Sequence, residues 1–83
     1  MIQIDFTTRA DIVPDYIVDE WGIKRIYDEN GELHSYNDLP AVITPLGSKH
    51  WYKHGKLHRE NGLPAISYSG GQKEYWIDGI KIK

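Results

Sequence analysis

A 24-residue internal repeat is the feature of this sequence that most constrains its fold. When the chain is aligned with itself at that shift, residues 30–34 (NGELH) lie on residues 54–58 (HGKLH). Residues 37–42 (NDLPAV) lie on residues 61–66 (NGLPAI), and the aromatic pair Trp51-Tyr52 lies on Tyr75-Trp76. Matches of this length are rare by chance in a chain of 83 residues. The sequence therefore predicts repeated small units.

We expect residues 1–83 to form a single domain, because a chain of this length supports only one small core. Units at 24–47 and 48–71 are followed by a truncated unit at 72–83. Residues 1–23 hold an N-terminal strand and a degenerate earlier copy of the unit. In that copy, Val13-Pro14 followed by Gly22 corresponds to Leu39-Pro40 followed by Gly47.

Each unit is predicted to be β-structure, because Pro and Gly at every step would break a long helix. The pairs Asn30-Gly31, His54-Gly55 and Asp78-Gly79 suit two-residue type I′ hairpin turns, in which both central residues have positive φ. The fold predicted is all-β: a meander of repeated hairpins that forms one twisted antiparallel sheet, with at most one short helix. The strands expected are 24–28, 32–34, 41–44, 49–52, 56–58, 65–68, 72–77 and 80–82.

Two N-terminal segments add to this prediction. Residues 2–6 (Ile2 to Phe6) alternate apolar and polar side chains, as a strand would. We expect them to pair within the sheet or to mediate a homodimer, since an unpaired edge strand is a template for association. Residues 16–19 form either another strand or a single helical turn after Pro14.

Residues 51–66 (WYKHGKLHRENGLPAI) resemble the MORN-type hairpin repeats that are common in small proteins of bacteriophages and giant viruses. The shared form is an aromatic pair, a Gly, Leu-His-Arg and then Leu-Pro-Ala. The resemblance covers about residues 24–83, and it departs from ordinary MORN repeats in having Leu-Pro-Ala where those carry Gly-centred steps. It implies stacked β-hairpins and a phage origin. Short phage proteins often bind and inhibit a host or defence protein, such as a CRISPR effector.

Enzymatic function is not expected from this sequence. The absence of Cys excludes a disulfide framework, a thiol nucleophile and a thiolate metal site. The chain contains no Walker loop, nucleotide-binding Gly fingerprint, nucleophile elbow or His-Glu metal motif, and no apolar run long enough to span a membrane. We therefore expect a non-enzymatic protein-binding module without a cofactor. It would act by steric blocking in the cytoplasm, that of the host cell if the protein is viral.

The aromatic pairs are the strongest candidates for a binding surface. Because side chains alternate along a strand, one ring of each pair should be in the core and the other partly exposed. Exposed Trp, Tyr and Arg are enriched at interface hot spots. The expected partner-binding residues are Trp51, Tyr52, Lys53, Lys56, Arg59 and Trp76.

Charge is unevenly distributed along the chain. Residues 1–38 contain nine acidic and three basic residues, a net charge of −6, whereas residues 39–83 contain three acidic and seven basic residues, a net charge of +4. The acidic half is either a solvated surface or an alternative binding surface that imitates nucleic-acid phosphates. It comprises Asp11, Asp15, Asp19, Glu20, Asp28, Glu29 and Glu32.

The basic half supports an alternative function, the binding of nucleic acid or of a membrane surface together with the aromatic residues. Its basic residues are Lys49, Lys53, Lys56, Arg59 and Lys73. We expect nucleic acid to be a less favourable partner than protein, because the basic residues are too sparse for strong DNA binding.

Histidines recur at every fourth position in His50, His54 and His58. On a helix this spacing would align three metal ligands, but Gly55 and the strand pattern place these residues on two arms of a hairpin. We therefore expect no metal site. His34 and His58 are expected to be structural residues of the repeat, each packing beside an aromatic ring and bonding a turn carbonyl.

Overall fold

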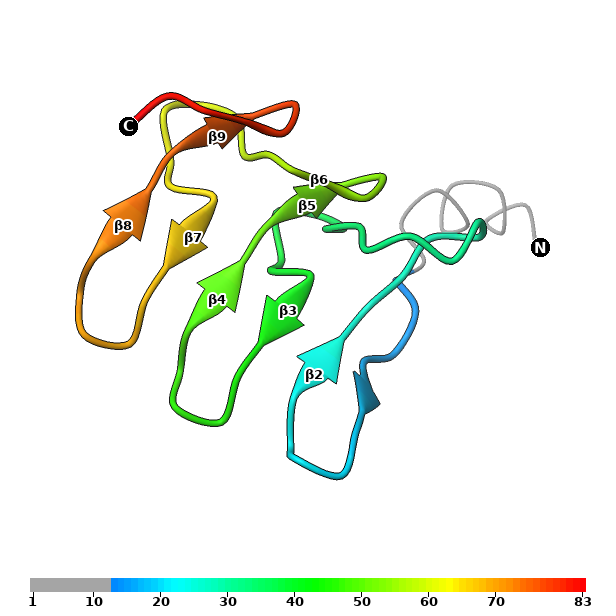
Figure 1. The fold of residues 1–83 in the computed structure, drawn as a ribbon. Helices are drawn as coiled ribbons and strands as arrows, with labels where there is room; N and C mark the ends of the chain where they lie inside the picture. Colours follow the sequence, from blue (N-terminus) through cyan, green and yellow to red (C-terminus); the bar gives the residue numbers. More distant parts are fainter. Residues whose placement is uncertain (1–12) are drawn as a thin grey trace, which may run out of the picture.

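The computed structural model describes residues 13–83, and all of its regular elements in that range are antiparallel strands (Figure 1). The all-β hairpin fold predicted from the sequence is confirmed, and no helix occurs among these residues. The predicted strand at residues 2–6 and the acidic residue Asp11 lie outside the described range. The strands are β1 (Ile17–Val18), β2 (Lys24–Arg25), β3 (Val42–Ile43), β4 (Lys49–His50), β5 (Tyr52–Lys53), β6 (Lys56–Leu57), β7 (Ile66–Ser67), β8 (Lys73–Glu74), β9 (Trp76–Ile77) and β10 (Ile80–Lys81).

The strands divide into one main sheet and two separate hairpins. The main sheet has six strands in the order β1-β2-β3-β4-β7-β8, while β5 pairs only with β6 and β9 only with β10. The sequence instead predicts a single continuous sheet. Figure 1 shows the main-sheet hairpins side by side, with the two other hairpins beyond their open ends.

The division arises at single residues that change hydrogen-bond partner. Trp51 lies between β4 and β5; its N–H donates to the carbonyl of Ala65 at 2.7 Å, whereas its own carbonyl accepts from the N–H of His58 at 3.1 Å. Ala65 precedes β7 of the main sheet and His58 follows β6 of the separate hairpin, so the chain turns a corner at Trp51. Ile26 makes the same switch, from the carbonyl of Ala41 to the N–H of His34.

The hairpins of the main sheet close through three-residue loops at 20–22, 45–47 and 69–71. In each loop the last residue is a glycine with positive φ, between 81° and 100°. The residue before the loop accepts from this glycine's N–H and donates to the residue after the loop, as in the pair of bonds that Thr44 makes with Gly47 and Ser48. A glycine suits this left-handed position because it has no Cβ.

The predicted type I′ turns are present at two of the three expected positions. His54-Gly55 has φ values of 46° and 87°, and Asp78-Gly79 has 51° and 83°. Asn30-Gly31 differs, because only Gly31 has positive φ and the loop contains three residues between Asp28 and Glu32. The Asp28 carboxylate explains the longer loop, since its Oδ1 accepts the N–H groups of Asn30 and Glu32 at 2.9 Å each.

The core is small and consists of side chains at most 6% exposed: Ile26, Ala41, Trp51, Ala65 and Ile66. Ala41 and Ala65 are fully buried, and each is bonded through its backbone to strands on both sides. The small methyl side chain of alanine fits the close packing at these positions. The Leu-Pro-Ala motifs at 39–41 and 63–65 thus place their alanines between neighbouring hairpins.

Two histidines connect consecutive units. The Nδ1 atom of His34 accepts the N–H of His54 at 3.0 Å, and 24 residues later the Nδ1 atom of His58 accepts the N–H of Asp78 at 2.9 Å. In both cases the ring reaches the turn of the following hairpin. A structural role was predicted for both residues, but the bonded partner is a turn N–H and not a turn carbonyl.

Candidate functional site

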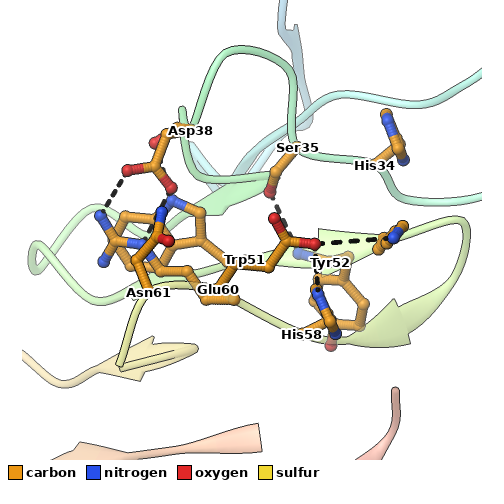
Figure 2. A pocket seen from close by; sticks show the side chains of 10 residues that line it. His34, Ser35, Asp38, Trp51, Tyr52, His58, Glu60 and Asn61 are labelled. Carbon is orange, nitrogen blue, oxygen red and sulfur yellow. Dashed lines mark hydrogen bonds and ion pairs between the residues drawn. The ribbon is translucent and has the colours of Figure 1, made fainter. Parts of the chain in front are cut away.

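A groove of about 350 Å³ lies between two equivalent loops of consecutive units. The loop that follows His34 forms one wall, the loop that follows His58 forms the other, and the segment 51–53 lies between them (Figure 2). The residues that line it are His34, Ser35, Asp38, Trp51, Tyr52, Lys53, His58, Arg59, Glu60 and Asn61.

Two tight turns shape the walls of this groove. In one, the N–H of Leu39 donates to the carbonyl of Tyr36, and both central residues, Asn37 and Asp38, have positive φ. In the other, the N–H of Leu63 donates to the carbonyl of Glu60, and Asn61 is again in the left-handed region. Asn and Asp tolerate this conformation better than most residues. These turns bring Asp38 and Asn61 to the rim.

Trp51 forms the floor of the groove. It is only 6% exposed, and its indole Nε1–H donates to the backbone carbonyl of Asp38 at 2.9 Å. Of the aromatic pair Trp51-Tyr52, Trp51 is therefore the core ring and Tyr52 the partly exposed one. The second pair is less differentiated, because Tyr75 and Trp76 are both partly exposed.

Arg59 covers the Trp51 ring, with its guanidinium carbon 3.7 Å from the ring centroid. Its Nε and one terminal nitrogen each lie 3.0 Å from the Asp38 carboxylate, and the other terminal nitrogen donates to the carbonyl of Pro64 at 3.2 Å. The hydrogen bonds from Arg59 hold the pKa of Asp38 below its ordinary value. The sequence places Arg59 among exposed contact residues, but in the structure its side chain is 16% exposed and fixed on three sides.

The accessible side chains of the groove include Tyr52, Lys53 and Glu60. The Glu60 carboxylate lies 3.2 Å from Nε2 of His58 and 3.6 Å from the ammonium of Lys53, and it remains 63% exposed. The hydrogen bond with His58, together with the charge of Lys53, lowers the pKa of Glu60. Glu60 therefore keeps its negative charge at neutral pH, beside a positive charge and an aromatic ring.

Two of the predicted binding residues lie outside the groove. Lys56 lies on β6 and packs beside the turn of the next hairpin. A Cβ atom placed on Gly79 of that turn would lie 3.7 Å from the Cβ of Lys56. Trp76 lies on β9, and its indole donates to Glu74 at 2.9 Å. The structure thus brings together Trp51, Tyr52, Lys53 and Arg59 from the predicted set.

The remaining lining residues, among them Ser35, Asp38 and Glu60, are absent from that set. Their signal in the sequence is the repeat itself. Residues 34–38 and 58–62 are equivalent at the 24-residue shift, and the groove lies between these two copies.

The acidic residues of the N-terminal half differ in their exposure and in their contacts. Asp19 and Asp28 are engaged within the protein, whereas Asp15, Glu20, Glu29 and Glu32 are exposed. Burial acts to raise the pKa of Asp19, but hydrogen bonds from Ile23, Arg25 and Trp21 together outweigh it, so the pKa is lowered. Hydrogen bonds from His54 and from the N–H of Glu32 lower the pKa of Asp28.

The described residues contain one cluster with possible metal ligands, in which ligand atoms of Asp28, His34 and His54 lie within 4.8 Å of one another. It differs from the His50, His54 and His58 set considered from the sequence. The two imidazoles are stacked at 4.1 Å, and the Nδ1 lone pair of His34 already accepts the N–H of His54. A neutral His34 then carries its proton on Nε2, so neither nitrogen is ready to bind a metal ion. The cluster is better explained as a contact between units.

Stability should fall as the pH drops below about 6.5. Burial lowers the pKa of His34 and of His50 in the folded protein. At a pH between the lowered pKa of these histidines in the folded protein and their ordinary pKa in the unfolded chain, the unfolded chain binds protons that the folded chain does not. Protonation therefore favours unfolding. We expect the melting temperature to decrease from pH 8 to pH 5, and the decrease to be smaller in His50→Asn. A melting temperature that is constant over this range would contradict the prediction.

Residues 13–83 include no helix with the length and apolar character needed to cross a membrane. Comparison of the chain with protein-family models, with curated proteins and with solved structures finds no match.

Proposed function

We propose that this chain is a non-enzymatic protein-binding module, encoded by a phage, that inhibits a host or defence protein by steric blocking. The target class would be a CRISPR effector or another immunity protein in the cytoplasm of the host. The resemblance of residues 51–66 to hairpin repeats of small phage proteins supports this origin. The groove between the two units supports the binding role.

The observation that carries the proposal is the position of Tyr52 in the groove. Tyr52 is partly exposed and lines the groove together with the oppositely charged pair Lys53 and Glu60, while the buried Trp51 forms the floor. An exposed Tyr with a polar rim is typical of an interface hot spot. Because the floor and walls are held by hydrogen bonds, little conformational entropy is lost when a partner binds.

Charge pairing makes a protein partner more favourable than nucleic acid at this site. The guanidinium of Arg59 is neutralised by Asp38, and Lys53 lies near Glu60. Binding to nucleic acid depends on the number of free cations that neutralise phosphates. The groove offers few of these, whereas its mixture of both charge signs around an aromatic ring suits a protein surface.

The test compares two neighbouring lysines. Lys53 and Lys56 are cross-strand partners in one hairpin and are both exposed, but only Lys53 lines the groove. We expect Tyr52→Ala and Lys53→Ala to weaken binding of a partner captured from host lysate by tenfold or more, and Lys56→Ala to leave it within about twofold. Purified partner should lose activity when the wild-type protein is added.

Three results would contradict the proposal. The captured protein could bind all three variants equally, its retention could disappear on nuclease treatment, or its activity could be unaffected by the bound chain. Circular dichroism and thermal melts of each variant would separate loss of binding from loss of fold.

A further inference from the structure

The turns of the three main-sheet hairpins lie along one edge of the protein, at the lower side of Figure 1. We call the turns 20–22, 45–47 and 69–71 the tip edge. Two of these turns carry large apolar side chains in the open: Trp21 is 70% exposed and Leu46 is 84% exposed. The two turns are in contact, because a Cβ on Gly22 would lie 3.2 Å from Cγ of Pro45. Two adjoining turns of the tip edge therefore carry exposed apolar side chains, whereas the third turn, 69–71, consists of Ser and Gly.

A row of lysines crosses the main sheet next to the tip edge. Cross-strand pairing connects Lys24 to Ile43, Ile43 to Lys49, Lys49 to Ser67 and Ser67 to Lys73. Directly paired residues share a face of the sheet. Lys24, Lys49 and Lys73 thus lie on one face, on alternate strands about 10 Å apart.

These three lysines are exposed and, among residues 13–83, make no ion pair. Four other basic side chains in that range each lie within 4.0 Å of a carboxylate: Arg25, Lys53, Arg59 and Lys81. The lysine row is therefore a local positive strip on a chain whose net charge is −2. Glu20 is the exposed acidic residue in the adjoining turn.

We infer that the tip edge and the lysine row form a second docking surface, which binds an acidic protein surface with an apolar pocket. The lysines supply charge complementarity and steer association, and Trp21 with Leu46 supplies the anchor. Nucleic acid fits less well, because three cations release too few counterions for firm binding. The surface includes no residue that lines the groove, so it does not depend on the function proposed for the groove.

The test uses a random copolymer of glutamate and tyrosine, fluorescently labelled, as an acidic polypeptide with apolar side chains. We expect fluorescence anisotropy to show binding that weakens at least tenfold in Trp21→Ser. Ile80→Ser is the matched control, because Ile80 is 68% exposed on another hairpin; it should bind as the wild type does. Trp21 makes its turn bond through the backbone N–H to Asp19, so the turn survives the substitution.

Charge is tested with two double variants that change the net charge equally. Lys49→Ser with Lys73→Ser should weaken binding of the copolymer at least tenfold, whereas Lys56→Ser with Lys81→Ser should change it by less than about twofold. Tyr52→Ala, in the groove, should also bind the copolymer normally. If Trp21→Ser does not fold, Leu46→Ser takes its place.

The inference is overturned if the copolymer does not bind, or if the tip-edge variants and their controls bind it equally. It is also overturned if a short oligodeoxythymidylate, or vesicles of phosphatidylcholine and phosphatidylserine, bind more tightly than the copolymer. Those outcomes would assign the lysine row to nucleic acid or to a lipid surface.

Discussion

Replacing Trp51 with Ala should lower the free energy of unfolding by about 3–5 kcal/mol. The indole is 6% exposed, donates a hydrogen bond to the carbonyl of Asp38 and lies under the guanidinium of Arg59. Truncation would open a cavity at the junction of two units and leave that guanidinium without its ring. Domains of this size are stable by only about 5–15 kcal/mol, so this loss is a substantial part of the total and should lower the melting temperature clearly. Chemical denaturation followed by circular dichroism measures the change.

Tyr52→Ala is the matched control, because Tyr52 follows Trp51 directly and its side chain points away from the core. We expect a loss of less than about 1.5 kcal/mol, since its ring is already partly exposed to water. Its backbone N–H bond to the hydroxyl of Ser35 is retained in this variant. Equal losses from the two substitutions would show that Tyr52 belongs to the core as much as Trp51 does.

Replacing Arg59 with Ala should cost about 2–3 kcal/mol, which is large for a residue at the rim of a groove. The variant loses the two-pronged contact with Asp38, the bond to the carbonyl of Pro64 and the stack on Trp51. A hydrogen bond to a charged group contributes more than one between neutral groups. Because the Asp38 side chain is 57% exposed, water compensates part of the loss.

Arg59→Lys separates geometry from charge. An ammonium keeps the positive charge but cannot form the planar two-pronged contact or stack in the same way. We therefore expect Arg59→Lys to recover less than half of the stability lost in Arg59→Ala, and the melts of both variants to depend little on salt. A full recovery by lysine would mean that simple charge attraction explains the role of Arg59.

The turns of this fold are its most predictable part. Glycines at fixed steps mark the loops, and at His54-Gly55 and Asp78-Gly79 even the turn type follows from the residue pair. At Asn30-Gly31 the same reasoning fails, because the carboxylate of Asp28 binds two N–H groups and favours a longer loop. The preference of Asn-Gly for a two-residue turn is thus outweighed by the hydrogen bonds of a side chain two positions earlier.

The division into a main sheet and separate hairpins was less accessible from the sequence. It depends on where Ile26 and Trp51 direct their carbonyls, and nothing in residue type or periodicity encodes that choice. Each predicted strand from residue 24 onward still overlaps an observed strand or the bridge between Tyr27 and Leu33. Pattern thus locates extended segments, whereas the partner of each segment is decided by packing between units.

The candidate site shows the same limit. Alternation along the strand predicts that one ring of Trp51-Tyr52 is buried, but not which one. Arg59 and Asp38 are 21 residues apart in the sequence. Because of their contact, Arg59 helps to hold the groove together, whereas the sequence predicts an exposed side chain that is free to bind a partner. The histidine prediction succeeds in its role and fails in its partner, because Nδ1 of His58 accepts from an N–H group.

Between residues 13 and 83, no side-chain hydrogen bond or ion pair joins positions more than 26 apart, the span from Asp28 to His54. Every unit is therefore held by its immediate neighbours alone. Such a chain can be lengthened by inserting another copy of residues 48–71, because the copy can re-form the same contacts at both of its junctions, and its stability would grow roughly in proportion to the number of units. Duplication of this one short segment would therefore lengthen the protein and repeat residues of both the groove and the lysine row.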